Sequence, residues 1–186
     1  MNKIKIIKSE EMNKHKITKV IEKKYLNDLL NKPIKIKNKN DISNKPNGFW
    51  LSINEGWEKW CKSEMPEWIE NSTIAELKFN PSYNIMLIEE VNDIIGAWND
   101  YLNESGFKSK YPKGDSIMCF YDENYNICNF WSWLINKYKL TGIYLTNEGE
   151  WKTRMTTFLY GWDCESIVIF IPEIINKEKT IEIKNE

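Results

Sequence analysis

Residues 160–175 form the stretch YGWDCESIVIFIPEII, which contains the clearest strand signal of the chain. Within it, Ile167-Val-Ile-Phe-Ile171 is the longest uninterrupted apolar run of the chain, and most of its members are β-branched. A short apolar run of this composition, followed by Pro172, predicts a strand over residues 166–171 that is buried on both faces. The run is far too short to span a bilayer. A strand of this kind needs neighbouring strands beside it and other elements packed on the sheet, so it indicates where the core lies.

The sequence on either side predicts the remaining core elements. Residues 48–53 and 142–146 predict two more central strands, and apolar stripes at helical spacing predict helices over 89–103 and 125–139. Weaker patterns predict a first strand at 16–20, or alternatively at 4–7, and further strands at 74–79, 85–88 and 180–184, the last as an edge strand. They also predict helices at 22–31 and 56–63 and a loop at 37–47. The segment 116–121 is ambiguous. Helices and strands alternate irregularly and without Gly-rich turns. This order favours a single α+β domain with a mixed or antiparallel central sheet and packed helices over a doubly wound fold.

Charge is distributed unevenly between the two ends of the chain. Residues 1–50 hold 13 Lys against five acidic residues, a net charge of +8, and residues 51–186 carry −9. We therefore expect a basic, partly ordered segment at 1–47 that belongs to the same domain as an α+β body at 48–186. Such a segment is typical of nucleic-acid contact or of a solvated, Lys-rich leader. It holds few aromatic rings for base stacking, since Tyr25 is the only one before Phe49.

Several functional classes lack their sequence signature. The four Cys occur at 61, 119, 128 and 164 without a CxxC pair, which argues against a zinc ribbon or a disulfide framework. His15 is the only histidine, so we expect no metal site that needs two. The Gly-rich phosphate loops and the GxSxG elbow do not occur. An acidic group at Glu89, Glu90 and Asp93 suits the start of a helix better than a metal site. The first residues contain no continuous apolar region, so we predict a cytoplasmic protein, in its own cell or in a host cell, that does not contact a membrane.

Two segments place chemically useful side chains in defined positions. In Lys45-Pro-Asn-Gly-Phe-Trp-Leu-Ser52, a turn delivers a strand on which Trp50 and Ser52 face the same way and can line a cofactor pocket. In the second segment, Glu165 stands at the entrance of the apolar strand, after a loop that carries Tyr160. A carboxylate held rigidly beside apolar groups is suited to catalysis. The same position also suits a solvated loop Glu next to a core strand.

These segments resemble two motifs of the ADP-ribosyltransferase fold. Glu165-Ser-Ile-Val-Ile-Phe170 is similar to the E-Y-[VI]-[VI]-[FY] strand that begins with the catalytic Glu, and Gly48-Phe-Trp-Leu-Ser52 is similar to the G-[IL]-[YW]-[FL]-[SA] strand that carries the nicotinamide-stacking aromatic residue. His15-Lys-Ile-Thr18 lies where that branch of the fold has its first-strand His, with two residues between His and Thr. The whole chain also resembles a group of phage and bacterial proteins with K-P-x-G-L-W-x-S near the start and Y-G-W-D-C-x-S near the end.

The resemblance implies an enzyme that uses NAD and transfers ADP-ribose to a macromolecular acceptor, protein or nucleic acid. It implies that Glu165 is catalytic, that Trp50, Ser52, His15, Thr18 and Tyr160 bind NAD, and that no metal takes part. Glu165→Gln should then fold normally but lose most transfer activity, because a neutral amide cannot stabilise the positive charge that develops on the ribose.

Two other classes of function stay open. One is a non-catalytic phage, viral or bacterial protein that binds a host component through a Trp-rich surface, since nine of 186 residues are Trp. The other is a nucleic-acid-binding module that uses the basic segment. Trp50, Ser52 and Glu165 in one cleft would favour the enzyme, whereas Glu165 in open solvent would favour the interaction protein.

Overall fold

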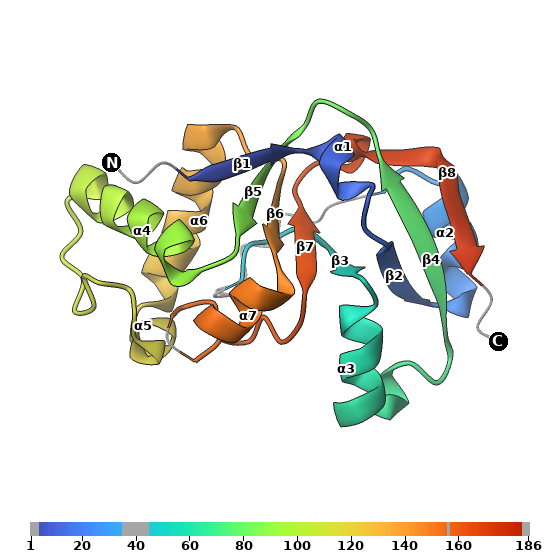
Figure 1. The fold of residues 1–186 in the computed structure, drawn as a ribbon, viewed down its shortest axis with the longest axis horizontal. Helices are drawn as coiled ribbons and strands as arrows, with labels where there is room; N and C mark the ends of the chain where they lie inside the picture. The colour runs from blue at the N-terminus through green and yellow to red at the C-terminus, as the bar shows by residue number, and fades with distance from the viewer. Residues whose placement is uncertain (1–3, 35–44, 156, 184–186) are drawn as a thin grey trace.

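Eight strands form one sheet in the spatial order β1-β5-β6-β7-β3-β2-β4-β8, as the computed structural model shows for residues 4–34, 45–155 and 157–183 (Figure 1). The strands are β1 (Lys5–Lys8), β2 (Ile17–Glu22), β3 (Phe49–Ile53), β4 (Ser72–Phe79), β5 (Asn84–Ile88), β6 (Gly142–Leu145), β7 (Ser166–Ile169) and β8 (Ile175–Ile183). Neighbouring strands are antiparallel except β5 and β6. The fold is therefore a single mixed α+β domain with a mostly antiparallel sheet, which confirms the predicted fold class.

Within the described part of the chain, seven helices accompany the sheet. They are α1 (Ser9–Met12), α2 (Leu26–Asn31), α3 (Gly56–Glu64), α4 (Val91–Ser105), α5 (Ile117–Asp122), α6 (Asn124–Tyr138) and α7 (Asn147–Thr153), with 3-10 turns at Lys23–Tyr25, Pro66–Trp68 and Pro172–Ile174. Helices α4, α5 and α6 lie in the connection between the parallel strands β5 and β6, where a crossover is required. Among the residues that the structure describes, no helix is long and apolar enough to cross a membrane.

The predicted central strands are adjacent in the sheet, in the order β6, β7, β3. All four residues of β7 are buried, as the apolar run predicts, and the strand ends at Ile169, shortly before Pro172. On one face, a core cluster joins Val168 to Trp98 of α4 and Phe130 of α6. On the other face, a second cluster joins Ile167 to residues of β2, β3, β4 and β6. The two predicted amphipathic helices thus cover one face, and the second cluster, which also includes Met12 of α1, lies on the other.

The strand register brings three hydroxyl residues into one row. Thr18 on β2 lies opposite Ser52 on β3, and Ser52 lies opposite Ser166 on β7. Because side chains alternate along a strand, this row and Trp50 share one face, while Leu51 and Ile167 point to the other. Strands β2 and β3 pair only at Ile17↔Ile53 and Thr18↔Ser52, whereas β2 follows β4 over six residues. Beyond Thr18, β2 therefore separates from β3.

The acidic group of Glu89, Glu90 and Asp93 lies at the start of α4 and has a structural role there, as the sequence predicts. The Asp93 carboxylate accepts hydrogen bonds from the backbone N–H groups of Glu89 and Glu90, at 2.9 and 3.0 Å, at the beginning of α4. Lys5 of β1 forms ion pairs with Glu89 and Asp93 at 3.1 and 3.2 Å. These carboxylates are used for helix capping and for holding β1 next to α4.

Several local predictions need correction. The segments 4–7 and 16–20, weighed as alternatives for one strand, both lie in strands, β1 and β2. The predicted helix at 22–31 is shorter, because β2 continues to Glu22 and a 3-10 turn precedes α2. The edge strand predicted at 180–184 is β8, which begins already at Ile175. The ambiguous segment 116–121 forms α5, and α7 was not predicted. Most of the predicted loop at 37–47 lies outside the described residues, and so do residues 1–3 and 35–44 of the basic segment 1–47.

Candidate functional site

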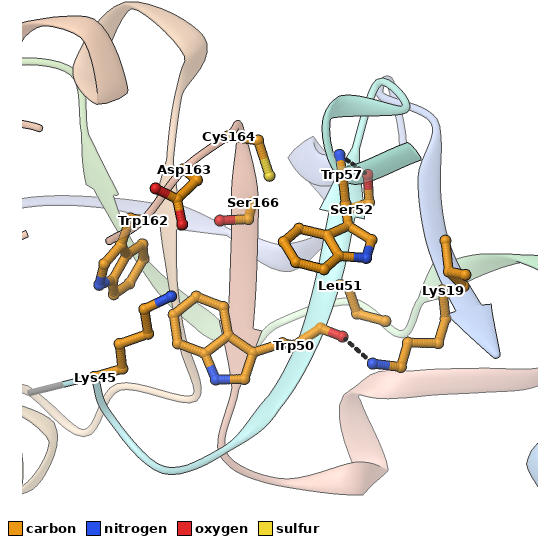
Figure 2. Close-up of a pocket in the computed structure, with 11 residues that line it drawn as sticks. Lys19, Lys45, Trp50, Leu51, Ser52, Trp57, Trp162, Asp163, Cys164 and Ser166 are labelled. Carbon is orange, nitrogen blue, oxygen red and sulfur yellow. Dashed lines mark hydrogen bonds between the residues drawn. The ribbon is translucent and has the colours of Figure 1, made fainter. Parts of the chain in front are cut away.

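A cleft of about 270 Å³ opens where β2 separates from β3 (Figure 2). Residues of β2, β3, α3, β7 and the loop before β7 line it, together with Lys45 from the turn before β3: Lys19, Val20, Lys45, Trp50, Leu51, Ser52, Trp57, Trp162, Asp163, Cys164 and Ser166. Trp50 is only partly buried and lines this cleft, which is the placement that the turn and strand pattern predicts.

Aromatic rings form the walls of the cleft. The Trp50 ring meets the Trp162 ring edge-on, with centroids 4.6 Å apart. Across the cleft, Trp57 of α3 is stacked on Trp60 at 4.9 Å, so its orientation is supported from behind. Flat apolar walls of this kind suit a planar ring, which gains stacking contacts and loses little entropy on binding.

Helix α3 lies close to the cleft because its first residue has no side chain. A Cβ atom at Gly56 would lie 2.9 Å from the carbonyl oxygen of Glu165, closer than real Cβ atoms come to other atoms. The absence of that atom lets α3 start against the loop before β7. Trp57 and Glu58 follow directly in the first turn of the helix. Gly56 therefore sets the distance between the α3 wall and the strands.

A buried carboxylate lies under the cleft, and the sequence reasoning missed it. Glu58 is only 3% exposed. It accepts hydrogen bonds from the hydroxyls of Thr18 and Ser52, the latter at 2.5 Å, and the Ser52 oxygen accepts the backbone N–H of Trp57 at 3.0 Å. This network fixes Ser52 at the cleft floor and ties α3 to two strands. The available signal was the spacing of Glu58 and the buried Cys61 on the inner side of α3.

Two lysines and a thiol contribute to the electrostatics of the cleft. Burial lowers the pKa of the Lys19 amine, an effect that the charge of Glu58 opposes. Burial also lowers the pKa of Lys45, which the neighbouring Asp163 opposes. Burial and the charge of Asp163 raise the pKa of the Cys164 thiol to about 12, so this thiol is protonated at neutral pH. In Figure 2 the two lysines lie on opposite sides of Trp50.

Glu165 does not line this cleft. Its carboxylate accepts hydrogen bonds from the Tyr144 hydroxyl at 2.5 Å and from the Asn54 amide at 3.2 Å. The same amide lies 3.3 Å from Nδ1 of His15, and the rings of His15 and Tyr144 are 5.6 Å apart. Tyr144 belongs to the core cluster on the opposite face of the sheet from Trp50. The physical reason is alternation: Ser166 faces the cleft, so the residue before it faces away.

Glu165, Tyr144, Asn54 and His15 form a network on the reverse face. The pKa values of Tyr144 and His15 are shifted within it. Burial and the Glu165 carboxylate raise the pKa of Tyr144, because both oppose a phenolate. Burial lowers the pKa of His15, and the charge of Glu165 partly opposes this. Glu165 is therefore neither in open solvent nor in the cleft.

The six residues that the resemblance assigns to catalysis or NAD binding lie in three places. Trp50 and Ser52 line the cleft, and Thr18 contacts Glu58 beneath it. Glu165 and His15 lie together on the reverse face. Tyr160 does not line the cleft; its ring is 6.0 Å from that of Tyr121. Among the described residues, no group of three or more His, Cys, Asp or Glu could hold a metal ion.

Comparison of the chain with models of protein families, with curated proteins and with solved structures found no match.

Proposed function

We propose that this protein is an ADP-ribosyltransferase-like enzyme that binds the nicotinamide end of NAD in the cleft at Trp50 and transfers ADP-ribose to a macromolecular acceptor. The observation that carries the proposal is the joint position of Trp50 and Ser52, on one strand face, in a cleft that Trp57 closes from the other side. The cleft is near the lower limit for ligand pockets, about 300 Å³, and fits one ring system with its sugar.

The chemistry needs an aromatic face and a fixed carboxylate. Trp50 can support the cationic nicotinamide ring by stacking and cation–π attraction, about 0.5–2 kcal/mol. When the bond between nicotinamide and ribose breaks, positive charge develops on the ribose, as in glycoside hydrolysis. A carboxylate held in place before the reaction stabilises that charge.

Two carboxylates compete for this role. The resemblance assigns it to Glu165, whose carboxylate is bound by Tyr144 and Asn54 on the reverse face. The geometry favours Glu58, which accepts a hydrogen bond from the Ser52 hydroxyl, and Ser52 lines the cleft. Ribose bound next to Ser52 would be close to the Glu58 charge but on the other side of the sheet from Glu165.

The test is NAD turnover by the wild type and by two charge-neutralising variants, Glu58→Gln and Glu165→Gln. Labelled NAD is incubated with protein and nucleic-acid acceptor fractions, and released nicotinamide and transferred label are measured. We expect Glu58→Gln to lower the rate about 10²–10³-fold while NAD binding is largely retained. Glu148→Gln, on the exposed side of α7, serves as the control. A wild type that neither binds nor cleaves NAD contradicts the proposal, and a large loss in Glu165→Gln alone returns the catalytic role to Glu165.

A second candidate function is supported by an exposed aromatic cluster beside the cleft. Trp68 and Tyr25 are 53% and 48% exposed, and Trp68 lies within about 6 Å of the rings of Trp57 and Trp60. Exposed Trp and Tyr side chains are typical of binding hot spots. If the protein acts by binding a host component instead, Trp68→Ser should abolish its capture of that component from host lysate, whereas Trp151→Ser, at an exposed Trp of α7, should not.

A further inference from the structure

Lys19 is partly buried and places a positive charge in the cleft. Its amine donates a hydrogen bond to the carbonyl oxygen of Trp50 at 3.0 Å and lies 5.1 Å from the centre of the Phe49 ring. Within the part of the chain that the structure describes, no carboxylate forms an ion pair with it. A lysine ammonium has three N–H donors, so two remain for a ligand or for water.

The nearest negative charge is already engaged. Both oxygens of Glu58 accept hydroxyl hydrogen bonds, from Thr18 and Ser52. Burying an ammonium without a full set of partners is unfavourable, and burial lowers the pKa of this amine accordingly. For the other lysine of the cleft, Lys45, the opposing charge is that of Asp163. Among the residues that the structure describes, none forms an ion pair with Lys19, although its amine lies in the cleft.

The rest of the cleft indicates which kind of anion would fit. Trp50 lies between Lys19 and Lys45 in the cleft, so a ligand that reaches the Lys19 amine passes along this ring (Figure 2). Trp57 offers a second aromatic surface from α3. A ligand with a planar ring and a negatively charged group a few bonds away would use both features. A cavity of about 270 Å³ holds a group of mononucleotide size and not a whole dinucleotide.

We propose that the cleft binds a phosphate-bearing nucleotide, with its ring on Trp50 and its phosphate paired with the Lys19 amine. The inference rests on the proposed function only in using the same cleft, and it requires no cleavage of NAD. Pairing with phosphate supplies the missing acceptors and places the opposite charge beside the ammonium. Such charge-assisted contacts are stronger than neutral hydrogen bonds.

The test compares ligands that differ only in the phosphate, with calorimetric titration at constant ionic strength. The pairs are AMP with adenosine, and nicotinamide mononucleotide with nicotinamide riboside. We expect the wild type to bind the phosphate form of at least one pair tenfold or more tightly. Lys19→Met, which keeps the length of the side chain, should abolish that preference and leave binding of the nucleoside unchanged. Lys19→Arg should retain part of the preference, and Lys62→Met, on the exposed side of α3, should retain all of it.

The outcomes separate this inference from the proposed function. Equal binding of phosphate and nucleoside forms by the wild type, no binding of either, or a preference that survives in folded Lys19→Met overturns the inference. A phosphate preference that depends on Lys19, in a protein that does not cleave NAD, supports the inference and contradicts the proposed function. Cleavage of NAD without such a preference supports the proposed function and contradicts the inference.

Discussion

Glu58 and Glu165 lie on opposite faces of the same group of strands, and the two carboxylates differ in burial and in hydrogen-bond partners. Glu58 comes from α3, is buried, and is held by the hydroxyls of Thr18 and Ser52 under the cleft. Glu165 precedes β7, is partly exposed, and is bound by Tyr144 and Asn54. A position next to a core strand in the sequence therefore does not show on which face of the sheet a carboxylate lies. The neighbour of Glu165 in sequence, Ser166, lines the cleft, although Glu165 does not.

The most direct test of this difference is the loss of stability when each carboxylate is removed in turn. Glu58→Ala leaves two buried hydroxyls without their acceptor, and we expect the free energy of unfolding to fall by about 2–4 kcal/mol. In Glu165→Ala, water can reach the exposed Asn54 amide, so only the Tyr144 hydroxyl is left without its acceptor, and we expect a loss of about 1.5 kcal/mol. Urea unfolding at pH 7 measures both, with Glu148→Ala on α7 as the exposed control. Equal losses in the two variants would show that the two environments do not differ as described.

Removal of a single hydroxyl on the reverse face should have a smaller effect. Tyr144→Phe deletes the donor to Glu165 and keeps the ring, and we expect it to lower the free energy of unfolding by about 1 kcal/mol at pH 7, because water can reach the partly exposed Glu165 carboxylate. The exposed Tyr25→Phe is the matched control.

This variant also predicts a change with pH. The folded protein raises the pKa of Tyr144, so it holds the phenolic proton more tightly than the unfolded chain does. The resulting stability is complete below the unfolded pKa of about 10 and is lost as the pH rises above it. The difference between wild type and Tyr144→Phe should therefore narrow above pH 10. A constant difference across this range would contradict the burial of the hydroxyl.

The elements that could be predicted from sequence are those with a strong apolar period. The run at 167–171 and the stripes of α4 and α6 bury many side chains, so local pattern and tertiary structure agree. Helix α7 has no comparable stripe in Asn147-Glu-Gly-Glu-Trp-Lys-Thr153, and Trp151 is in fact exposed. The start of β8 is polar because β8 is an edge strand with exposed residues. Both elements depend on neighbours that are distant in sequence.

The candidate site was predictable only in part for a related reason. The facing of Trp50 and Ser52 follows from alternation within one strand, which the sequence shows. The row of Thr18, Ser52 and Ser166 depends on the register between three strands, which no local pattern contains. Glu58 resembles a surface residue of a short polar helix until Thr18 and Ser52 are placed beneath it. Adjacent residues of a strand face opposite ways, so either Glu165 or Ser166 faces the cleft. Which of the two does so depends on how β7 pairs with β3, and the sequence alone does not show that pairing.

The finest distinction between the two faces can be measured at His15. Because His15 is the only histidine, one imidazole signal in a proton NMR titration reports its pKa without assignment of other residues. Burial lowers this pKa, and the charge of Glu165 partly restores it. We expect Glu165→Gln to lower the pKa of His15 further, because the restoring charge is gone. Glu58→Gln, on the opposite face, should leave it unchanged and serves as the matched control.

The same shift fixes the sign of a small effect on stability. The folded pKa of His15 lies below its unfolded value of about 6.5, so the unfolded chain binds the proton more readily. The corresponding stability is present above pH 6.5 and is lost as the pH falls through the folded pKa. His15→Asn should remove this loss, which urea unfolding at pH 7 and pH 5 can detect. If Glu165→Gln and Glu58→Gln moved the His15 signal equally, the two carboxylates would not be separated by the sheet, and the assignment of Glu165 to the reverse face would be wrong.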